Sequence, residues 1–323
     1  MYIAEERIQA VLTYGALIPA IREALMDYSA GRVEQPLRTI LRVMPESGAE
    51  GATPGWFAVM PAIAGGYLGV KTVTFFPANA GLGIPTHLAT IELLRRATGE
   101  PLAVMDGRLI TEMRTAAVSA VAVEALAAKG ARTLGILGGG VQARAHMEAL
   151  RMVWPAFREP GSVKLWSRDA AKAAAVAGKM GALAASLEET AGCDVVVTVT
   201  SSPTPVVRGE WLTAGSLVVA VGAVGRHLRE LDATVMQGCL IAESRQGAEN
   251  ESGDVILSGA RVFAELGEVL AGAAPALPSG RRVFKSLGMA IEDVTAARLV
   301  WEALGMRPGC ELEGGLASAT GPQ

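Results

Sequence analysis

Hydrophobic positions change their spacing along the chain, and the changes divide it into regions. From residue 6 to residue 30 apolar side chains recur every three or four positions, which predicts one or two amphipathic helices. Over residues 35–76 and 89–105, short apolar or alternating runs separated by turn-rich pieces predict antiparallel strands. The expected strands are 39–43, 56–60, 67–75, 89–92 and 102–105. The first hundred residues should therefore form a mixed α+β unit.

A second pattern follows an alanine-rich helix expected within residues 111–129. Continuous apolar runs then alternate with helical sequence, as in the buried strands of a parallel sheet. These runs are 134–137, 163–166, 193–200, 216–221 and 239–242, with a capping box at 186–189. The alternation predicts an α/β, doubly wound nucleotide-binding domain. A last helix at 290–304 should return to the first domain, and the tail from Gly314 should be frayed.

Composition and charge narrow the possible partners. With 29 basic and 32 acidic residues the net charge is −3, and no long basic run is present to neutralise a nucleic-acid backbone. Three widely spaced cysteines form no C-x-x-C pair, so neither a disulfide framework nor a zinc site is expected. Because the N-terminus is charged and no apolar run approaches the roughly 20 residues of a membrane span, we expect a cytoplasmic protein without membrane partners.

A glycine-rich turn after the run at 134–137 suggests the ligand of the second region. Gly138, Gly140 and Ala143 have the spacing G-x-G-x-x-A, in which bare backbone approaches a pyrophosphate at a helix N-terminus. A glycine triplet alone is a weak signal, and a merely tight turn is the alternative. The alternation of strands and helices around it favours the dinucleotide site.

The residues after the second strand of the nucleotide domain select the cofactor. Ser167 can bond a 2′-phosphate without repelling it, and Arg168 can pair with that phosphate and stack on adenine. These two residues favour NADP(H) over NAD(H). The alternative is that Arg168 is a solvated surface residue and that Asp169 binds the ribose, although Asp169 is better suited to cap the next helix.

Motifs distributed along most of the chain make the sequence resemble the ornithine cyclodeaminase/mu-crystallin family, particularly its mu-crystallin branch. The matching segments are 35–39 (QPLRT), 60–61 (MP), 71–74 (KTVT), 85–87 (PTH), 106–107 (DG), 114–120 (RTAAVSA), 138–143 (GGGVQA), 251–255 (ESGDV), 263–269 (FAELGEV) and 284–290 (FKSLGMA). The resemblance implies a substrate-binding and dimerisation domain at 1–118 plus 300–323, a Rossmann domain at 119–299, and a homodimer.

The resemblance also implies that Arg38, Lys71 and Arg114 surround the substrate, with Thr86 beside them. An arginine fork suits the carboxylate of a small amino or imino acid. Lys71 lies in an apolar strand-like context, where burial beside two arginines should lower its pKa and make it a plausible catalytic proton donor or acceptor.

Each of these residues also has a plainer interpretation. Lys71 alone would be a solvated strand-edge lysine, and Arg114 could pair with Glu112 or neutralise a helix end. Thr86 could simply satisfy a turn, and His87 could be either a residue of the site or a packed histidine. Three histidines in all leave no metal cluster to expect.

One departure from the family pattern changes the expected substrate. Ornithine cyclodeaminases carry an aspartate for the substrate's side-chain amine after the fifth Rossmann strand, and here Val224 takes its place. A desolvated ammonium without a partner costs on the order of several kcal/mol, so ornithine is a poor candidate. The expected reaction is NADPH-dependent reduction of a cyclic ketimine carboxylate, either Δ1-pyrroline-2-carboxylate to proline or Δ1-piperideine-2-carboxylate to pipecolate.

Two other functions remain open: an alanine-dehydrogenase-like or N-alkyl amino acid dehydrogenase, and a non-enzymatic ligand-binding protein. The predicted cofactor-binding residues are Gly138, Gly140, Val141, Gln142, Ala143, Ser167, Arg168, Thr200, Val221 and Ser286.

Overall fold

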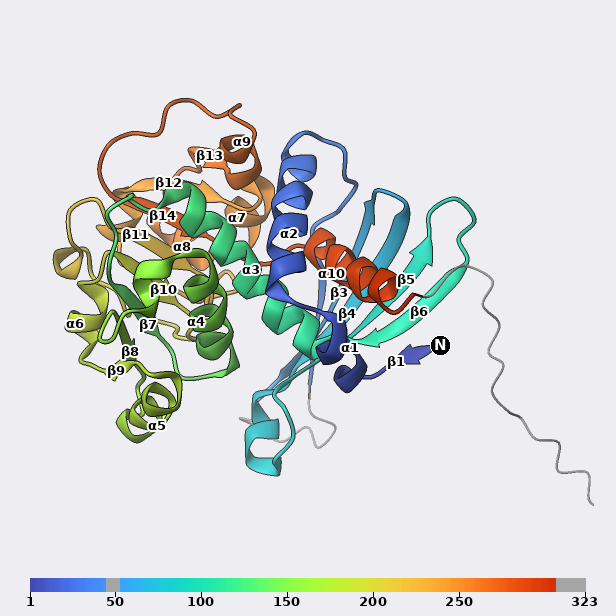
Figure 1. Cartoon of the computed structure of the whole chain (residues 1–323), viewed down its shortest axis with the longest axis horizontal. Coiled ribbons are helices and arrows are strands. Elements are labelled where there is room, and N and C mark those ends of the chain that lie inside the picture. Colours follow the sequence, from blue (N-terminus) through green and yellow to red (C-terminus); the bar gives the residue numbers. More distant parts are fainter. Residues whose placement is uncertain (45–52, 306–323) are drawn as a thin grey trace, which may run out of the picture.

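The computed structural model describes residues 1–44 and 53–305, which form two sheets joined through a shared helical layer. Figure 1 shows the eight-stranded sheet with its helices on one side of the molecule, the six-stranded sheet on the other, and α3 (Arg108–Leu126) crossing between them. The expected Rossmann domain and α+β domain are therefore both present. The expected frayed tail lies outside the described residues.

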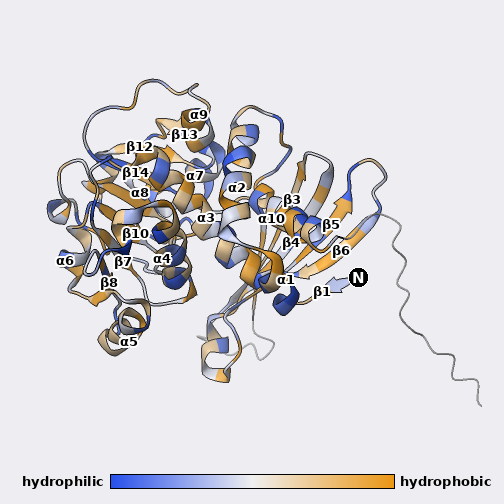
Figure 2. Ribbon diagram, in the orientation of Figure 1, coloured by the Kyte–Doolittle hydropathy of each residue, from blue (hydrophilic) through white to orange (hydrophobic). Residues whose placement is uncertain are grey.

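The six-stranded sheet has the order β1-β6-β5-β4-β3-β2, antiparallel except for the β1–β6 pair. Its strands are β1 (Tyr2–Ile3), β2 (Thr39–Val43), β3 (Gly55–Ala64), β4 (Tyr67–Phe75), β5 (His87–Arg95) and β6 (Pro101–Asp106). Each expected strand of the first hundred residues appears, extended where alternation continues into the neighbouring turns. Figure 2 shows hydrophobic colouring along β3 to β6, as expected for a sheet that packs on a core.

The eight-stranded sheet is wholly parallel, with the order β13-β12-β14-β11-β10-β7-β8-β9. Its strands are β7 (Leu134–Leu137), β8 (Val163–Trp166), β9 (Leu183–Ala184), β10 (Val195–Thr198), β11 (Leu217–Ala220), β12 (Cys239–Ala242), β13 (Ala264–Glu265) and β14 (Arg282–Lys285). The strands expected from apolar runs are confirmed. The sequence pattern missed β14, although it lies between β11 and β12 near the middle of the sheet.

The helices pack against both sheets, and one of the two buried hydrophobic clusters includes residues of both sheets. The helices are α1 (Glu5–Val11), α2 (Tyr14–Ser29), α3, α4 (Val141–Val153), α5 (Ala170–Met180), α6 (Leu187–Ala191), α7 (Arg245–Glu251), α8 (Gly253–Ser258), α9 (Leu266–Leu270) and α10 (Ala290–Ala303). The expected capping box at Ser186 and Glu189 starts α6. Among the described residues, no helix is both long and apolar enough to cross a bilayer.

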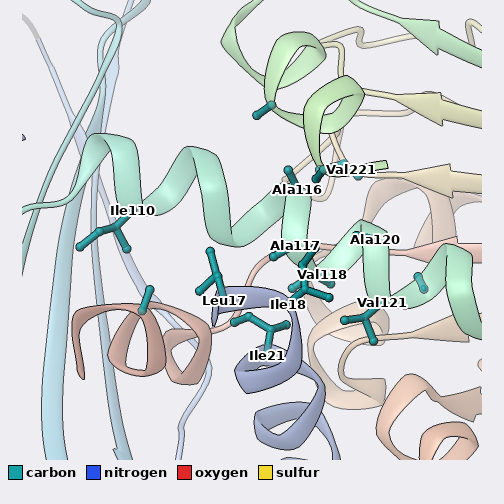
Figure 3. Packing of buried hydrophobic residues seen from close by; sticks show 14 of the residues in the cluster. Leu17, Ile18, Ile21, Ile110, Ala116, Ala117, Val118, Ala120, Val121 and Val221 are labelled. Atoms are coloured by element: carbon teal, nitrogen blue, oxygen red, sulfur yellow. The ribbon is translucent and has the colours of Figure 1, made fainter. Parts of the chain in front are cut away.

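Helix α3 is the main connection between the domains. Its alanine-rich middle is completely buried, and it contacts α2 on one side and α4 and β11 on the other. Figure 3 shows Leu17 and Ile21 of α2 beside α3, with Val221 near Ala116 on the nucleotide-domain side. The expected boundary at 118/119 therefore falls inside a continuous helix rather than at a linker.

Helix α10 returns the chain to the six-stranded sheet. It contacts β3, β4 and β5 along its length and starts at Ala290, about ten residues before the expected 299/300 boundary. Its first turn consequently sits where the nucleotide sheet ends and the other sheet begins. This position brings the acidic residues of its first turn into the candidate site.

Candidate active site

The glycine-rich turn has the features that a pyrophosphate site requires. Gly138 has φ +139°, and an added Cβ there would lie 2.8 Å from the Val199 carbonyl oxygen, so only glycine fits. Gly140 is the N-cap of α4 and makes no side-chain capping hydrogen bond. A Cβ built on Gly140 would have no other atom within 4 Å, so the space beside it is open. The backbone amides of the first turn are thus exposed to a phosphate, while Ala143 is buried beneath them. The turn fits a dinucleotide.

Ser167 follows β8 and lies at one end of the glycine-rich turn. Its Cβ and Oγ lie 3.2 Å from a Cβ built on Gly139, so Ser167 borders the glycine turn directly. Asp169 is used as the N-cap of α5, where its Oδ1 accepts a hydrogen bond from the Lys172 amide at 3.0 Å. The expectation that Asp169 caps a helix is confirmed. Arg168 is exposed and makes no ion pair within the described ranges.

At the opposite end, Glu230 organises the loops that follow β10 and β11. Its completely buried carboxylate accepts five hydrogen bonds of 2.7–3.1 Å, from the Thr198 hydroxyl, the Thr200 amide and hydroxyl, and the amides of Gly222 and Ala223. Burial raises the pKa of Glu230, while Lys285 and these donors oppose the shift. The predicted cofactor residue Thr200 therefore directs its hydroxyl to Glu230, and the sequence analysis had overlooked Glu230.

A second buried pair supports the same loops. Lys285 Nζ lies 3.0 Å from Asp254 Oδ2 and donates to the Ala223 carbonyl at 3.1 Å, while Asp254 Oδ1 accepts from the amides of Glu230 and Leu231. The loops at the carboxyl ends of β10, β11 and β14, where a Rossmann sheet binds its ligand, are held by this network. The neighbouring Ser286 is buried, and its hydroxyl has no hydrogen-bond partner among the described residues.

The predicted basic residues Lys71 and Arg114 meet at the start of α10. Lys71, on β4 opposite Met60 of β3, is 2% exposed, and its Nζ lies 2.7 Å from Asp293 Oδ2. Arg114 of α3 lies 3.1 Å through Nε from Asp293 Oδ1 and 2.6 Å through Nη1 from Glu292 Oε2. Asp293 thus bridges the lysine and the arginine. The alternative pairing of Arg114 with Glu112 is not what the structure shows.

Burial and mutual repulsion perturb these groups. Burial, followed by the charge of Arg114, lowers the pKa of Lys71 to about 8, while Asp293 opposes the change. The expected direction of the Lys71 shift is confirmed. Burial, followed by the charge of Glu243, raises the pKa of Glu292 to about 8, while Arg114 opposes that change.

Arg38 joins this cluster from the loop before β2. Its Nε lies 2.9 Å from Glu251 Oε2, and its Nη2 donates to the carbonyls of Leu287 and Gly288 at 3.0 and 2.7 Å. Gly288 also lies against the Arg114 guanidinium, since a built Cβ would be 2.3 Å from Nη1. The loop after β14 is therefore held between two of the predicted substrate arginines.

A cavity opens beside this junction, lined by residues of both domains. Its lining includes Gln35, Arg38, Met60, Glu243, Glu251 and Gly288. Lys71 and Arg114 do not line it directly but lie against Met60 and Gly288, which do. Within the described part of the chain, no group of three or more His, Cys, Asp or Glu residues is arranged to hold a metal ion.

Thr86 and His87 lie apart from the cluster. The Thr86 hydroxyl is 3.2 Å from His87 Nδ1, and the His87 ring stacks on Phe75 at 4.3 Å. His87 pairs with Phe75, four residues along β4 from Lys71, which corresponds to about 13 Å. The structure thus does not place Thr86 beside the three basic residues as the resemblance implied. His146, by contrast, is a packed histidine: it lies between Ser119 and the Gln142 carbonyl, and burial lowers its pKa to about 4.

Comparisons with known proteins agree on the relatives of this chain. The model of the ornithine cyclodeaminase/mu-crystallin family matches residues 1–306. Ketimine reductase mu-crystallin of Mus musculus is 41% identical over 311 residues, covering 94% of this chain and 96% of its own.

Two solved structures share the fold. One is Thermococcus litoralis Δ1-pyrroline-2-carboxylate reductase in complex with NADH and L-proline, with a TM-score of 0.84 and 33% identity over 94% of this chain and 97% of its own. The other is an archaeal alanine dehydrogenase dimer with bound NAD, with a TM-score of 0.85 and 30% identity over 94% and 95%. Both sheets are included in these matches because coverage is nearly complete.

Proposed function

Because the chain belongs to the ornithine cyclodeaminase/mu-crystallin family, we propose that it is an NAD(P)H-dependent oxidoreductase that reduces the C=N bond of small cyclic ketimine carboxylates. Δ1-Pyrroline-2-carboxylate, giving proline, is the leading substrate, and Δ1-piperideine-2-carboxylate, giving pipecolate, is the next. The observation that carries the proposal is the buried junction of Arg38, Lys71 and Arg114 with the loop at the end of β14.

The two arginines bind the substrate carboxylate in this proposal. Arg38 Nη1 and Arg114 Nη2 hydrogen-bond to no atom of residues 1–44 and 53–305, while their other nitrogens are held by Glu251, Glu292, Asp293 and backbone carbonyls. A carboxylate can therefore be bound by nitrogens whose orientation is already fixed. Lys71, with its lowered pKa, is placed to exchange protons near neutral pH.

The nucleotide domain holds the cofactor at the carboxyl ends of its strands. The reduced nicotinamide supplies the hydride when it is bound. Gly138, Gly140 and Val141 to Ala143 receive the pyrophosphate, and Thr200, Val221 and Ser286 lie at the nicotinamide end. Glu230 and Lys285 keep these loops in place through their buried hydrogen bonds.

The preference for NADP(H) rests on Ser167 and Arg168. Ser167 borders the glycine turn, Arg168 is exposed beside it, and Asp169 is committed to capping α5. A 2′-phosphate would consequently meet a hydroxyl and a cation rather than a free carboxylate. The T. litoralis relative, in contrast, was solved with NADH.

The substrate class follows from Val224. This apolar side chain is 39% exposed in the loop after β11 and offers no partner to a distal ammonium. A cyclic imine has no second amine to accommodate, whereas ornithine does. Cyclodeamination of ornithine is therefore disfavoured.

We further propose a homodimer formed by the outer face of the six-stranded sheet. The row Leu41, Phe57, Thr74 and Leu88 crosses four strands on the face opposite α10, and Leu41 and Leu88 are 54% and 40% exposed. An apolar sheet face of this kind usually marks an interface, and one similar protein was solved as a dimer. Light scattering should give twice the chain mass, and Leu41→Glu should give monomers, while Leu257→Glu, at an exposed position of α8, should not.

The cytoplasm is the proposed location, because Cys193 and Cys239 are free thiols. Their partners in any disulfide would have to come from outside the described residues.

NADPH oxidation with different amine acceptors tests the proposed reaction. Δ1-Pyrroline-2-carboxylate and Δ1-piperideine-2-carboxylate should be reduced with much higher kcat/KM than pyruvate supplied with ammonia or methylamine. Faster reaction with pyruvate and an amine would instead identify an alanine-dehydrogenase-like or N-alkyl amino acid dehydrogenase. Tight NADPH binding without turnover of any imine would identify a ligand-binding protein.

A further inference from the structure

Two buried carboxyl groups from different domains lie on either side of Gly288. Glu243 follows β12 and is 3% exposed, and Glu292 is in the first turn of α10 and is fully buried. Glu243 Oε2 accepts from the Gly288 amide at 2.8 Å and from the Leu287 amide at 2.9 Å. Glu292 Oε2 lies 2.6 Å from Arg114 Nη1, the atom against which Gly288 packs. Glu243 lines the cavity at the domain junction, and Glu292 lies behind its wall, against Arg114.

Each carboxyl group leaves one oxygen unused. Glu243 Oε1 and Glu292 Oε1 are buried and form no hydrogen bond with any described residue. An ionised carboxylate oxygen buried in this way loses its hydration without compensation, which is costly. Protonation of one of these oxygens removes its charge and so lowers that cost.

The charges around the pair are not balanced. Lys71 and Arg114 are the cations, and they face the three carboxyl groups of Asp293, Glu292 and Glu243. The other nearby cations have acidic partners of their own: Arg38 is paired with Glu251 and Lys285 with Asp254. If every group were ionised, one negative charge would be buried in excess. Retaining one proton removes that excess.

We propose that Glu243 and Glu292 hold one proton between them and that this pair supplies the proton taken up by the ring nitrogen of the substrate. The inference rests on the proposed function. The reaction needs a proton donor, and Val224 cannot be that donor because it has no carboxyl group. The Glu243–Glu292 pair fills this role in the proposal. The raised pKa of Glu292 agrees with a proton held near neutral pH.

The step is balanced in atoms and charge. The C=N bond becomes a C–N single bond as its carbon gains hydride from the reduced nicotinamide, which is oxidised, and its nitrogen gains the proton from the carboxyl pair. The pair is left fully ionised beside Lys71 and Arg114. A proton from water restores it after the product leaves.

The first test does not depend on turnover. Infrared difference titration of the unliganded protein should show a protonated carboxyl band at pH 7 that disappears as the pH is raised. Glu292→Gln and Glu243→Gln should each abolish this band at pH 7, because either change removes the excess negative charge. Glu302→Gln, at the exposed end of the same helix, should keep it. Absence of the band in the unaltered protein, or its persistence in both variants, would overturn the shared proton.

The second test follows kcat and KM against pH with the cyclic imine. Glu292→Gln should lower kcat roughly 10²- to 10⁴-fold with little change in KM, as for loss of a general acid. Glu243→Gln should shift the alkaline limb of kcat to lower pH, because a neighbouring negative charge has been removed. A purely structural role would lower activity equally at all pH values, and that result would refute the proton supply. If the unaltered protein reduces no imine, the proposed function fails while the infrared titration still decides whether the proton is shared.

Discussion

Replacing Gly288 by alanine should disable the site by displacing Arg114, although no acidic or basic residue is replaced. Gly288 has φ +78°, and an added Cβ would lie 2.3, 2.7 and 2.9 Å from Nη1, Nη2 and Cζ of Arg114. An ordinary contact of 3.4 Å or more requires the guanidinium to retreat by about 1 Å. That retreat stretches the 2.6 Å pair with Glu292 and the 3.1 Å pair with Asp293.

The magnitude has a conformational part and a contact part. Alanine in the left-handed region costs about 1–2 kcal/mol. Disrupting a buried ion pair costs roughly 3–5 kcal/mol, and misplacing a substrate-binding group by about 1 Å lowers the rate by on the order of 100-fold. We therefore expect Gly288→Ala to lose several kcal/mol of unfolding free energy and at least about 100-fold in kcat/KM.

Gly31→Ala is the matched control. Gly31 has φ +72°, and a built Cβ there meets nothing within 4 Å, so it carries the conformational part alone. Urea unfolding and steady-state reduction of the cyclic imine, measured on both variants, separate the two parts. If Gly288→Ala were folded and kept activity within a factor of three of Gly31→Ala, the packing of Gly288 on Arg114 would have no role in the site.

Other changes probe the proton groups and the cofactor. Lys71→Ala should abolish turnover while leaving the dissociation constant for NADPH, measured by fluorescence, within a few-fold; near-normal turnover would remove its proposed role. Ser167→Asp, measured by the same titration, should change the NADPH-to-NADH affinity ratio by about 10- to 1000-fold, from a repulsion on the order of 1–4 kcal/mol; an unchanged ratio would place the 2′-phosphate elsewhere. Between pH 4.5 and about 8 the folded protein binds more protons at Glu292 than the unfolded chain, so this contribution to stability should fall as pH rises. Between about 8 and 10.5 the unfolded chain binds more protons at Lys71, so that contribution should rise with pH. The free energy of unfolding, measured in urea, should therefore have a minimum near pH 8, with a depth of a few kcal/mol at about 1.4 kcal/mol per pKa unit. Glu292→Gln should flatten the pH dependence below this minimum.

Predicting the fold from sequence worked where a single physical signal dominates. The runs at 134–137 and 163–166 coincide with β7 and β8, because strands buried on both faces must be apolar throughout. The strand β14 was missed because Arg282 and Lys285 stand at its ends. Lys285 is nevertheless 1% exposed, since Asp254 neutralises it, and Arg282 donates to the Leu126 carbonyl. Such partners come from distant segments and leave no local pattern.

The candidate site was only partly predictable for the same reason. Family motifs indicated Lys71 and Arg114, and the structure brings both onto Asp293. Acidic residues such as Glu292 and Asp293 are common in the first turn of a helix, where they interact favourably with the helix dipole and are usually exposed to solvent. Their complete burial here could therefore not be expected from the sequence. Thr86 shows the opposite case: its motif implied a place beside the basic residues, but Thr86 immediately precedes β5, whose first residue His87 pairs with Phe75, four residues along β4 from Lys71.

Arg38 and Arg114, the proposed substrate-binding arginines, are already paired with acidic residues in the unliganded protein, and this affects which substrates they can bind. Arg38 is fixed by Glu251 and the Gly288 carbonyl, and Arg114 by Glu292 and Asp293, so neither loses much freedom when it binds a ligand. Guanidinium groups that are fixed in place bind a carboxylate at one position and cannot shift to accommodate a longer substrate. A ring whose imine carbon adjoins its carboxylate meets that requirement with no further charge to satisfy. If the proposed site is correct, a diamino acid held by the same nitrogens brings a second ammonium, and Val224, which stands where ornithine cyclodeaminases carry an aspartate, offers it no partner.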